Sequence, residues 1–152
     1  VMTENATQFV RPLTFETLSG NRVIVDTFDR DFEWEVEHVS LAKKADLFLV
    51  APCTADFAGK LANGIADSPV SFACKAHLRN GRPVLLAVST NDGLSGSAAN
   101  LGALLARRHV YFVPFGQDSP TGKPASLVAH FSLLPEAAEA ALRGEQLQPL
   151  LV

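Results

Sequence analysis

Three apolar runs in this chain end in short polar stretches whose side chains could bind a small molecule. The stretch after residues 84–88, Ser89-Thr90-Asn91-Asp92, supplies hydroxyls, an amide and a carboxylate. The other two stretches, at 52–57 and 114–118, follow apolar runs at 47–51 and 110–113. Open α/β sheets bind ligands beyond the carboxyl ends of their strands. The pattern therefore predicts one ligand site, although each polar residue alone would equally suit a helix cap.

Few other side chains are candidates for chemistry. His38 follows an acidic stretch and can act as a general acid or base, because its pKa lies near neutrality; the alternative is an exposed surface histidine. Cys53 is either a reactive thiol at a strand end or a small buried hydrophobe, and Cys74 is expected in the core. The histidines and cysteines show no metal-ligand spacing, so no metal is predicted.

The elements that must position these residues alternate between strands and helices. Strands are predicted at 22–26, 47–51, 84–88 and 110–113; helices are predicted at 12–19, 38–45, 56–63, 69–78, 98–108 and 133–143, with a short helix or turn at 3–10. Residues 27–37 and 116–124 are predicted loops. The alternation indicates βαβ units around a parallel sheet. We expect a single α/β domain over residues 1–152, a three-layer, doubly wound, Rossmann-like fold whose first βα unit is missing.

The composition of the chain excludes several classes of binding partner. The chain has 152 residues and a net charge of −3, so it lacks the basic footprint of a protein that binds nucleic acid or an anionic membrane. It has no apolar run long enough to span a bilayer. Two cysteines are too few for a disulfide framework and favour a reduced, cytoplasmic location. A small molecule or another protein is the expected partner.

The first half carries two recognisable stretches, TENATQFVRPLTFETLSGNRV and EHVSLAKKADLFLVAPCTADFAGKLANGIAD. Over residues 2–67 it resembles the FMN-binding cysteine-decarboxylase flavoproteins, which include the phosphopantothenoylcysteine decarboxylases. The resemblance implies a flavoprotein fold, FMN as cofactor, His38 as a catalytic residue and a homo-oligomer with the flavin at subunit contacts. The flavin contacts that it implies are Thr3, Phe9, Pro52, Thr54, Asp56 and Asp67.

The flavin motif departs from that family's pattern. The family has Pro-Ala-Ser-Ala-Asn-Thr where this chain has Pro-Cys-Thr-Ala-Asp-Phe at residues 52–57. Thr54 can replace the serine hydroxyl, whereas Asp56 replaces an amide with a charge and Phe57 deletes a hydroxyl. A negative charge beside the flavin would disfavour the reduced flavin anion. The motif therefore predicts altered flavin affinity or redox potential.

The second half carries Ser-Thr-Asn-Asp at 89–92, Pro-Phe-Gly-Gln-Asp at 114–118 and Lys-Pro at 123–124. Over residues 60–152 it is similar to the family of dipicolinate synthase B subunits. That resemblance implies a dehydrogenase-like A subunit that carries NAD(P), and joint synthesis of pyridine-2,6-dicarboxylate for spores from a lysine-pathway intermediate. Asn91 then matches an asparagine that binds the substrate carboxylate. Asp92, also at the substrate, would repel that carboxylate and is expected to bind a backbone N–H or an arginine.

Two functions remain open, and we favour the first. The chain is either a B-type subunit of dipicolinate synthase or an FMN-dependent decarboxylase of phosphopantothenoylcysteine or a peptidyl cysteine. In the decarboxylase His38 moves a proton, but the methionines and tryptophan of the decarboxylase motif are absent after residue 88. An inactive binding domain is a third, less informative possibility.

Overall fold

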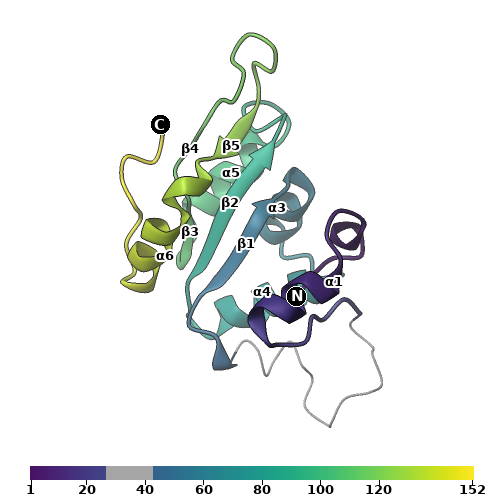
Figure 1. The fold of residues 1–152 in the computed structure, drawn as a ribbon. Helices are drawn as coiled ribbons and strands as arrows, with labels where there is room; N and C mark the ends of the chain where they lie inside the picture. The colour runs from purple at the N-terminus through teal and green to yellow at the C-terminus, as the bar shows by residue number, and fades with distance from the viewer. Residues whose placement is uncertain (27–42) are drawn as a thin grey trace.

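A parallel sheet centred on β2 (Val84–Thr90) forms the body of the protein. The computed structural model describes residues 1–26 and 43–152 (Figure 1). β2 runs parallel to β1 (Phe48–Cys53) on one side and to β3 (Val110–Phe112) on the other. Residues 84–88 of β2 are all buried, which explains why this strand reads as a continuous apolar run in the sequence.

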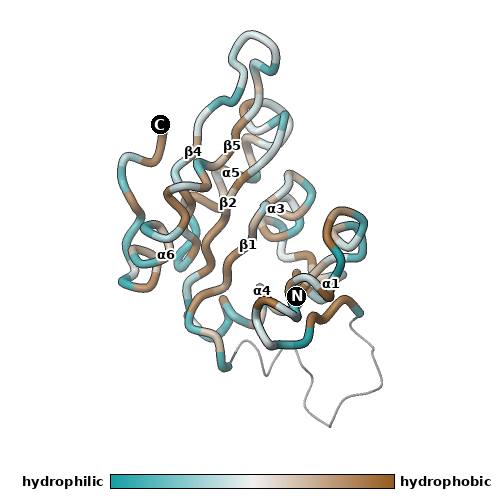
Figure 2. Tube along the Cα trace, in the orientation of Figure 1, coloured by the Kyte–Doolittle hydropathy of each residue, from teal (hydrophilic) through white to brown (hydrophobic). Residues whose placement is uncertain are grey.

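Helices cover both faces of this sheet, which confirms the three-layer α/β prediction. On one face lie α3 (Ala55–Ala62), α4 (Pro69–Arg79) and α5 (Ala98–Leu105). On the other face α6 (Leu134–Leu142), preceded by the short helix η2 (Phe131–Leu133), packs on Leu85 and Ala87 (Figure 1). The brown, hydrophobic course of β1 and β2 in Figure 2 marks the core between these layers.

Capping residues in the sequence predict where two of the helices begin or end. Ser68 caps α4 by accepting a hydrogen bond from Ser71 N at 3.3 Å, with Pro69 at the first helical position. Gly20 follows α1 (Pro12–Ser19) in the left-handed region, at φ 67°. Both features agree with the predicted boundaries.

The structure adds an antiparallel extension that the sequence does not predict. β5 (Leu127–Ala129) pairs antiparallel with Ser89 and Thr90 of β2, and β4 (Phe115–Gly116) pairs antiparallel with β5. Strands of two and three residues are too short to carry a periodic pattern, so only the pairing of β5 with β2 and of β4 with β5 defines them. The extension lies directly beyond the carboxyl end of β2.

The predicted strand at residues 22–26 is wrong. The segment is extended and Met2 N donates a 2.8 Å hydrogen bond to Ile24 O, but it forms no ladder with any strand in the described part of the chain. A strand requires a neighbour for its backbone groups, and a short apolar run does not supply one. Nearby, residues 3–10 form the short helix η1 (Asn5–Gln8), as predicted. The predicted loop at 27–37 and most of the helix at 38–45 lie outside the described residues.

Candidate functional site

The carboxyl ends of β1 and β2 lie side by side, as the sequence predicts. Cys53 is in register with Val88, so the polar residues that follow the two strands start from one edge of the sheet. Pro52, Thr54 and Asn91 are exposed at this edge. Thr54 also caps α3, because its Oγ1 accepts a hydrogen bond from Phe57 N at 3.3 Å.

Asp92 is held by two hydroxyl groups from its own loop. Thr90 Oγ1 donates to Asp92 Oδ1, and Ser97 Oγ donates to Asp92 Oδ2 at 3.0 Å. These bonds, that from Thr90 foremost, hold the pKa of the Asp92 carboxyl below its ordinary value. The two hydroxyls fill the role for which we expect a backbone N–H or an arginine. Asp92 thus holds the loop that presents Asn91 to solvent.

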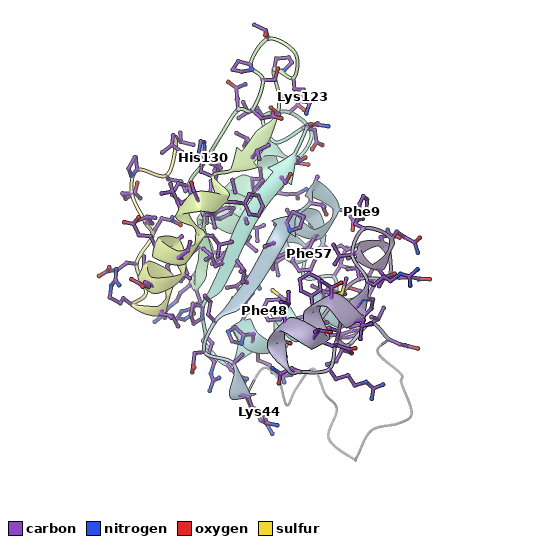
Figure 3. The ribbon with its side chains drawn as sticks, in the orientation of Figure 1. Phe9, Lys44, Phe48, Phe57, Lys123 and His130 are labelled. Carbon is purple, nitrogen blue, oxygen red and sulfur yellow. The ribbon has the colours of Figure 1, made fainter. Side chains whose placement is uncertain are left out.

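A second carboxylate organises the loop between β4 and β5. Ser126 Oγ donates a 2.6 Å hydrogen bond to Asp118 Oδ1, and Lys123 Nζ lies 3.1 Å from Asp118 Oδ2. Ser126 is fully buried, and its bond is the largest cause that lowers the pKa of Asp118. Gln117 Nε2 also donates to Pro124 O at 2.7 Å, which closes the loop across its base. Figure 3 shows Lys123 at the end of the molecule beyond β5.

The two loops form one unit, which we call the carboxyl-end lobe (residues 91–97 and 117–126). Leu94 N donates to Ala125 O at 2.9 Å and joins them. Gly93 lies so close to Leu127 that an added Cβ would approach its side chain to 2.8 Å. Sequence reasoning missed Thr90, Ser97 and Ser126 as the residues that position this lobe. Their partners, Asp92 and Asp118, lie two to eight residues away in the same loops, and single serines and threonines carry no signal for such pairings.

Asp56 and Asp67, predicted to contact a flavin, share one lysine instead of standing alone. Lys60 Nζ lies 3.1 Å from Asp56 Oδ2 and 3.2 Å from Asp67 Oδ2. Hydrogen bonds to Asp56 first and then to Asp67 raise the pKa of Lys60. The charge at Asp56 is therefore balanced locally, which weakens the effect that we predict it to have on a flavin.

Two of the remaining predicted residues, Thr3 and Phe9, flank η1 in the N-terminal segment. Thr3 Oγ1 accepts a hydrogen bond from Ala6 N at 3.2 Å, and Phe9 is 89% exposed on the N-terminal segment (Figure 3). His38 lies outside the described residues. Cys53 and Cys74 are fully buried, and burial raises the pKa of each thiol to about 12. Cys53 is therefore a core residue rather than a reactive thiol.

Neither a metal cluster nor a membrane span occurs within the described ranges 1–26 and 43–152. Histidine, cysteine and carboxylate side chains there form no group of three that could hold a metal ion. No helix in those ranges is both long and apolar enough to cross a membrane.

A doubly wound sheet with polar residues at its carboxyl edge is typical of the class of α/β proteins that bind ligands at that edge. The family model described as Flavoprotein matches residues 1–113, and this chain belongs to that family.

Individual relatives fall into two groups. The dipicolinate synthase B subunit of Bacillus subtilis (strain 168) is 50% identical over 107 residues, covering 70% of this chain and 54% of the relative. Coenzyme A biosynthesis bifunctional protein CoaBC of the same organism is 52% identical over 67 residues, covering 44% of this chain and 16% of the relative. The chain thus spans about half the length of the first relative and much less of the second.

The similar solved structures fall into the same two groups, dipicolinate synthase B subunits and decarboxylases. The dipicolinate synthase B subunit from Bacillus halodurans superposes with a TM-score of 0.77 and 44% identity, covering 86% of this chain and 65% of that one. The FMN-dependent cysteine decarboxylase TvaF from thioviridamide biosynthesis superposes with a TM-score of 0.67 and 27% identity, covering 93% and 76%.

The surface at the end of β1 suits the ring of a flavin. The turn between β2 and α5 does not suit the phosphate of a flavin. Leu49 is 40% exposed, and Ala51, Pro52 and Thr54 are exposed beside it, so an apolar surface lies next to a hydroxyl. The glycine-containing turn between β2 and α5 is no phosphate cradle. The N–H groups of Ser95 and Ser97 already bond to Asp92 O, at 3.0 and 3.1 Å, and the Asp92 carboxylate would repel a phosphate.

Proposed function

We propose that this chain acts as a B-type subunit of dipicolinate synthase, together with a dehydrogenase-like partner subunit that carries NAD(P). The observation that carries the proposal is the 50% identity to the Bacillus subtilis protein over 70% of this chain. The product would be pyridine-2,6-dicarboxylate, made for spores. We place the protein in the cytoplasm, where two free, buried cysteines stay reduced, and expect it to form a homo-oligomer.

In this function Asn91 would recognise the substrate. Its amide is exposed at the carboxyl end of β2 and can donate hydrogen bonds to a carboxylate. Asp92 would act as a positioning residue, because its carboxylate already binds Thr90 and Ser97. Pro52 and Thr54 would contact a bound FMN, which would supply two-electron redox chemistry.

The test is reconstitution with the dehydrogenase-like subunit. We expect the two proteins to co-purify and to form pyridine-2,6-dicarboxylate from the lysine-pathway intermediate when NAD(P) is present. Asn91→Ala should raise the KM about tenfold while kcat changes less, because a hydrogen bond to a charged group is lost. Asn21→Ala, an exposed asparagine beyond α1, is the matched control. Failure of the pair to form product, with both subunits folded, would overturn the proposal.

A second candidate is an FMN-dependent decarboxylase of phosphopantothenoylcysteine or a peptidyl cysteine. It is favoured by the CoaBC match and by the TvaF superposition. Its test is a visible spectrum of the purified protein, followed by CO₂ release from cysteine-containing carboxylates with His38→Asn as comparison. A protein that shows no flavin band and takes up no added FMN would exclude this candidate.

A further inference from the structure

A basic groove lies at the edge of the molecule opposite the carboxyl-end lobe. It is an open cavity of about 510 Å³ between α4 and the residues that follow α5. Its lining residues are Ala66, Phe72, Lys75, Ala76, Leu78, Arg79, Arg107 and Arg108. α4 leads into the start of β2, and α5 leads into the start of β3, so the groove belongs to the amino ends of these strands.

Four cationic side chains surround this groove, and the part of its lining that the structure describes contains no acidic residue. Two of the four are held in place by backbone carbonyls: Lys75 Nζ donates to Gly64 O and Arg107 Nη1 to Leu61 O, each at 2.8 Å. Arg79 and Arg108 are exposed at the rim. The chain as a whole carries a net charge of −3, so this concentration of positive charge runs against its overall balance.

We propose that the groove binds a small phosphate ester with an apolar substituent. Guanidinium groups bind phosphate oxygens through paired, charge-assisted hydrogen bonds, and two of them at one rim suit a single phosphate. Lys75 and Arg107 add positive potential from fixed positions. Phe72 and Leu78 give the groove an apolar wall on which the substituent packs, as is usual in ligand sites of this size.

This ligand is distinct from the substrate of the proposed function. The candidate substrate site lies at the carboxyl ends of β1 and β2, whereas the groove lies at the amino ends of β2 and β3. Helix-dipole compensation explains one part of the arrangement, because Arg79 lies in the last turn of α4 and Arg108 follows α5. It does not explain why four cations line one cavity with an apolar wall.

The test measures binding of phenyl phosphate and of inorganic phosphate to the whole chain by isothermal titration calorimetry at low ionic strength. We expect saturable binding of both, with phenyl phosphate the tighter. The double variant Arg79→Gln/Arg108→Gln should weaken phenyl phosphate binding about tenfold or more. Arg79→Lys/Arg108→Lys should restore part of the affinity, because it keeps the charge and loses only the guanidinium geometry.

The matched control is Lys123→Gln/Arg143→Gln, which removes two exposed charges that do not line the groove. We expect this variant to bind phenyl phosphate like the unmodified protein. Binding lost in the control and retained in the groove variant would place the anion outside the groove and overturn the proposal. Absence of saturable binding, or equal affinity for the two probes, would overturn it as well. Circular dichroism and thermal unfolding of each variant verify that it is folded.

Discussion

Ser126 Oγ donates a 2.6 Å hydrogen bond to Asp118 Oδ1 from a fully buried position, and so ties the start of β5 to the end of β4. Both strands are shorter than four residues and depend on such contacts for their position. Because β5 pairs with Ser89 and Thr90, this hydrogen bond also helps to hold the loop between β4 and β5 next to the carboxyl end of β2.

Ser126→Ala should therefore destabilise the fold by about 1–2 kcal/mol, because it removes the donor to a charged acceptor. Urea unfolding measures the change. Ser132→Ala, an exposed serine in η2, is the control and should change the free energy of unfolding by less than ~0.5 kcal/mol. Equal effects of the two substitutions would contradict a structural role for Ser126.

Asp92 and Asp118 should make the lobe sensitive to acid. The pKa of each carboxyl is lowered in the folded protein by hydrogen bonds, chiefly from Thr90 and from Ser126 respectively. A lowered pKa means that the stabilisation is present above the ordinary value of about 4 and is lost as the pH falls through the folded-state value. Urea unfolding between about pH 6 and pH 3 should show this loss.

The variant Asp92→Asn/Asp118→Asn should have a flatter pH dependence over that window than the unmodified protein. Asp46→Asn, which removes an exposed carboxylate before β1, should retain the steep dependence. A double variant that kept the full acid sensitivity would show that these two carboxylates do not cause it.

Gly93 should not accept a side chain. A Cβ at this position would lie 2.8 Å from Cδ1 and Cγ of Leu127, inside van der Waals contact. Gly93→Ala should cost about 1–3 kcal/mol of stability, because it forces Leu127 away from β2. In contrast, nothing lies within 4 Å of a Cβ added at Gly102 in α5, so Gly102→Ala should stabilise the fold by ~0.5–1 kcal/mol. The two melting temperatures should shift in opposite directions; a shift in the same direction would contradict this explanation.

Both cysteines should be unreactive in the folded protein. Burial raises the pKa of Cys53 and Cys74 to about 12, so the thiols stay neutral at about pH 8. A chromogenic disulfide reagent should label neither thiol in native buffer and both in denaturing urea. The variant Cys53→Ala, which retains only Cys74, should be labelled at one thiol in denaturing urea and so calibrates the number of thiols counted. Rapid labelling of the native protein would show that one thiol is accessible.

Much of the fold follows from local features of the sequence. The apolar run at 84–88 predicts a strand buried on both faces, because only a covered parallel strand tolerates such a run. Ser68 and Pro69 predict the start of α4 because the cap satisfies free N–H groups within three residues. The side-by-side placement of the carboxyl ends of β1 and β2 also follows, since parallel strands carry their carboxyl ends to one edge.

Only the tertiary structure decides the pairings between residues far apart or without a pattern. Residues 22–26 contain a short apolar run yet pair with no strand in the described part of the chain, whereas residues 127–129, too few to show a pattern, pair with β2. Asp56 pairs with Lys60 one helical turn away in α3, whereas Asp67 joins them from the segment after α3, and Ser126 meets Asp118 across the loop before β5. A local pattern determines which backbone conformation a segment prefers. Which partner satisfies its polar groups is determined by the segments that the folded chain brings beside it.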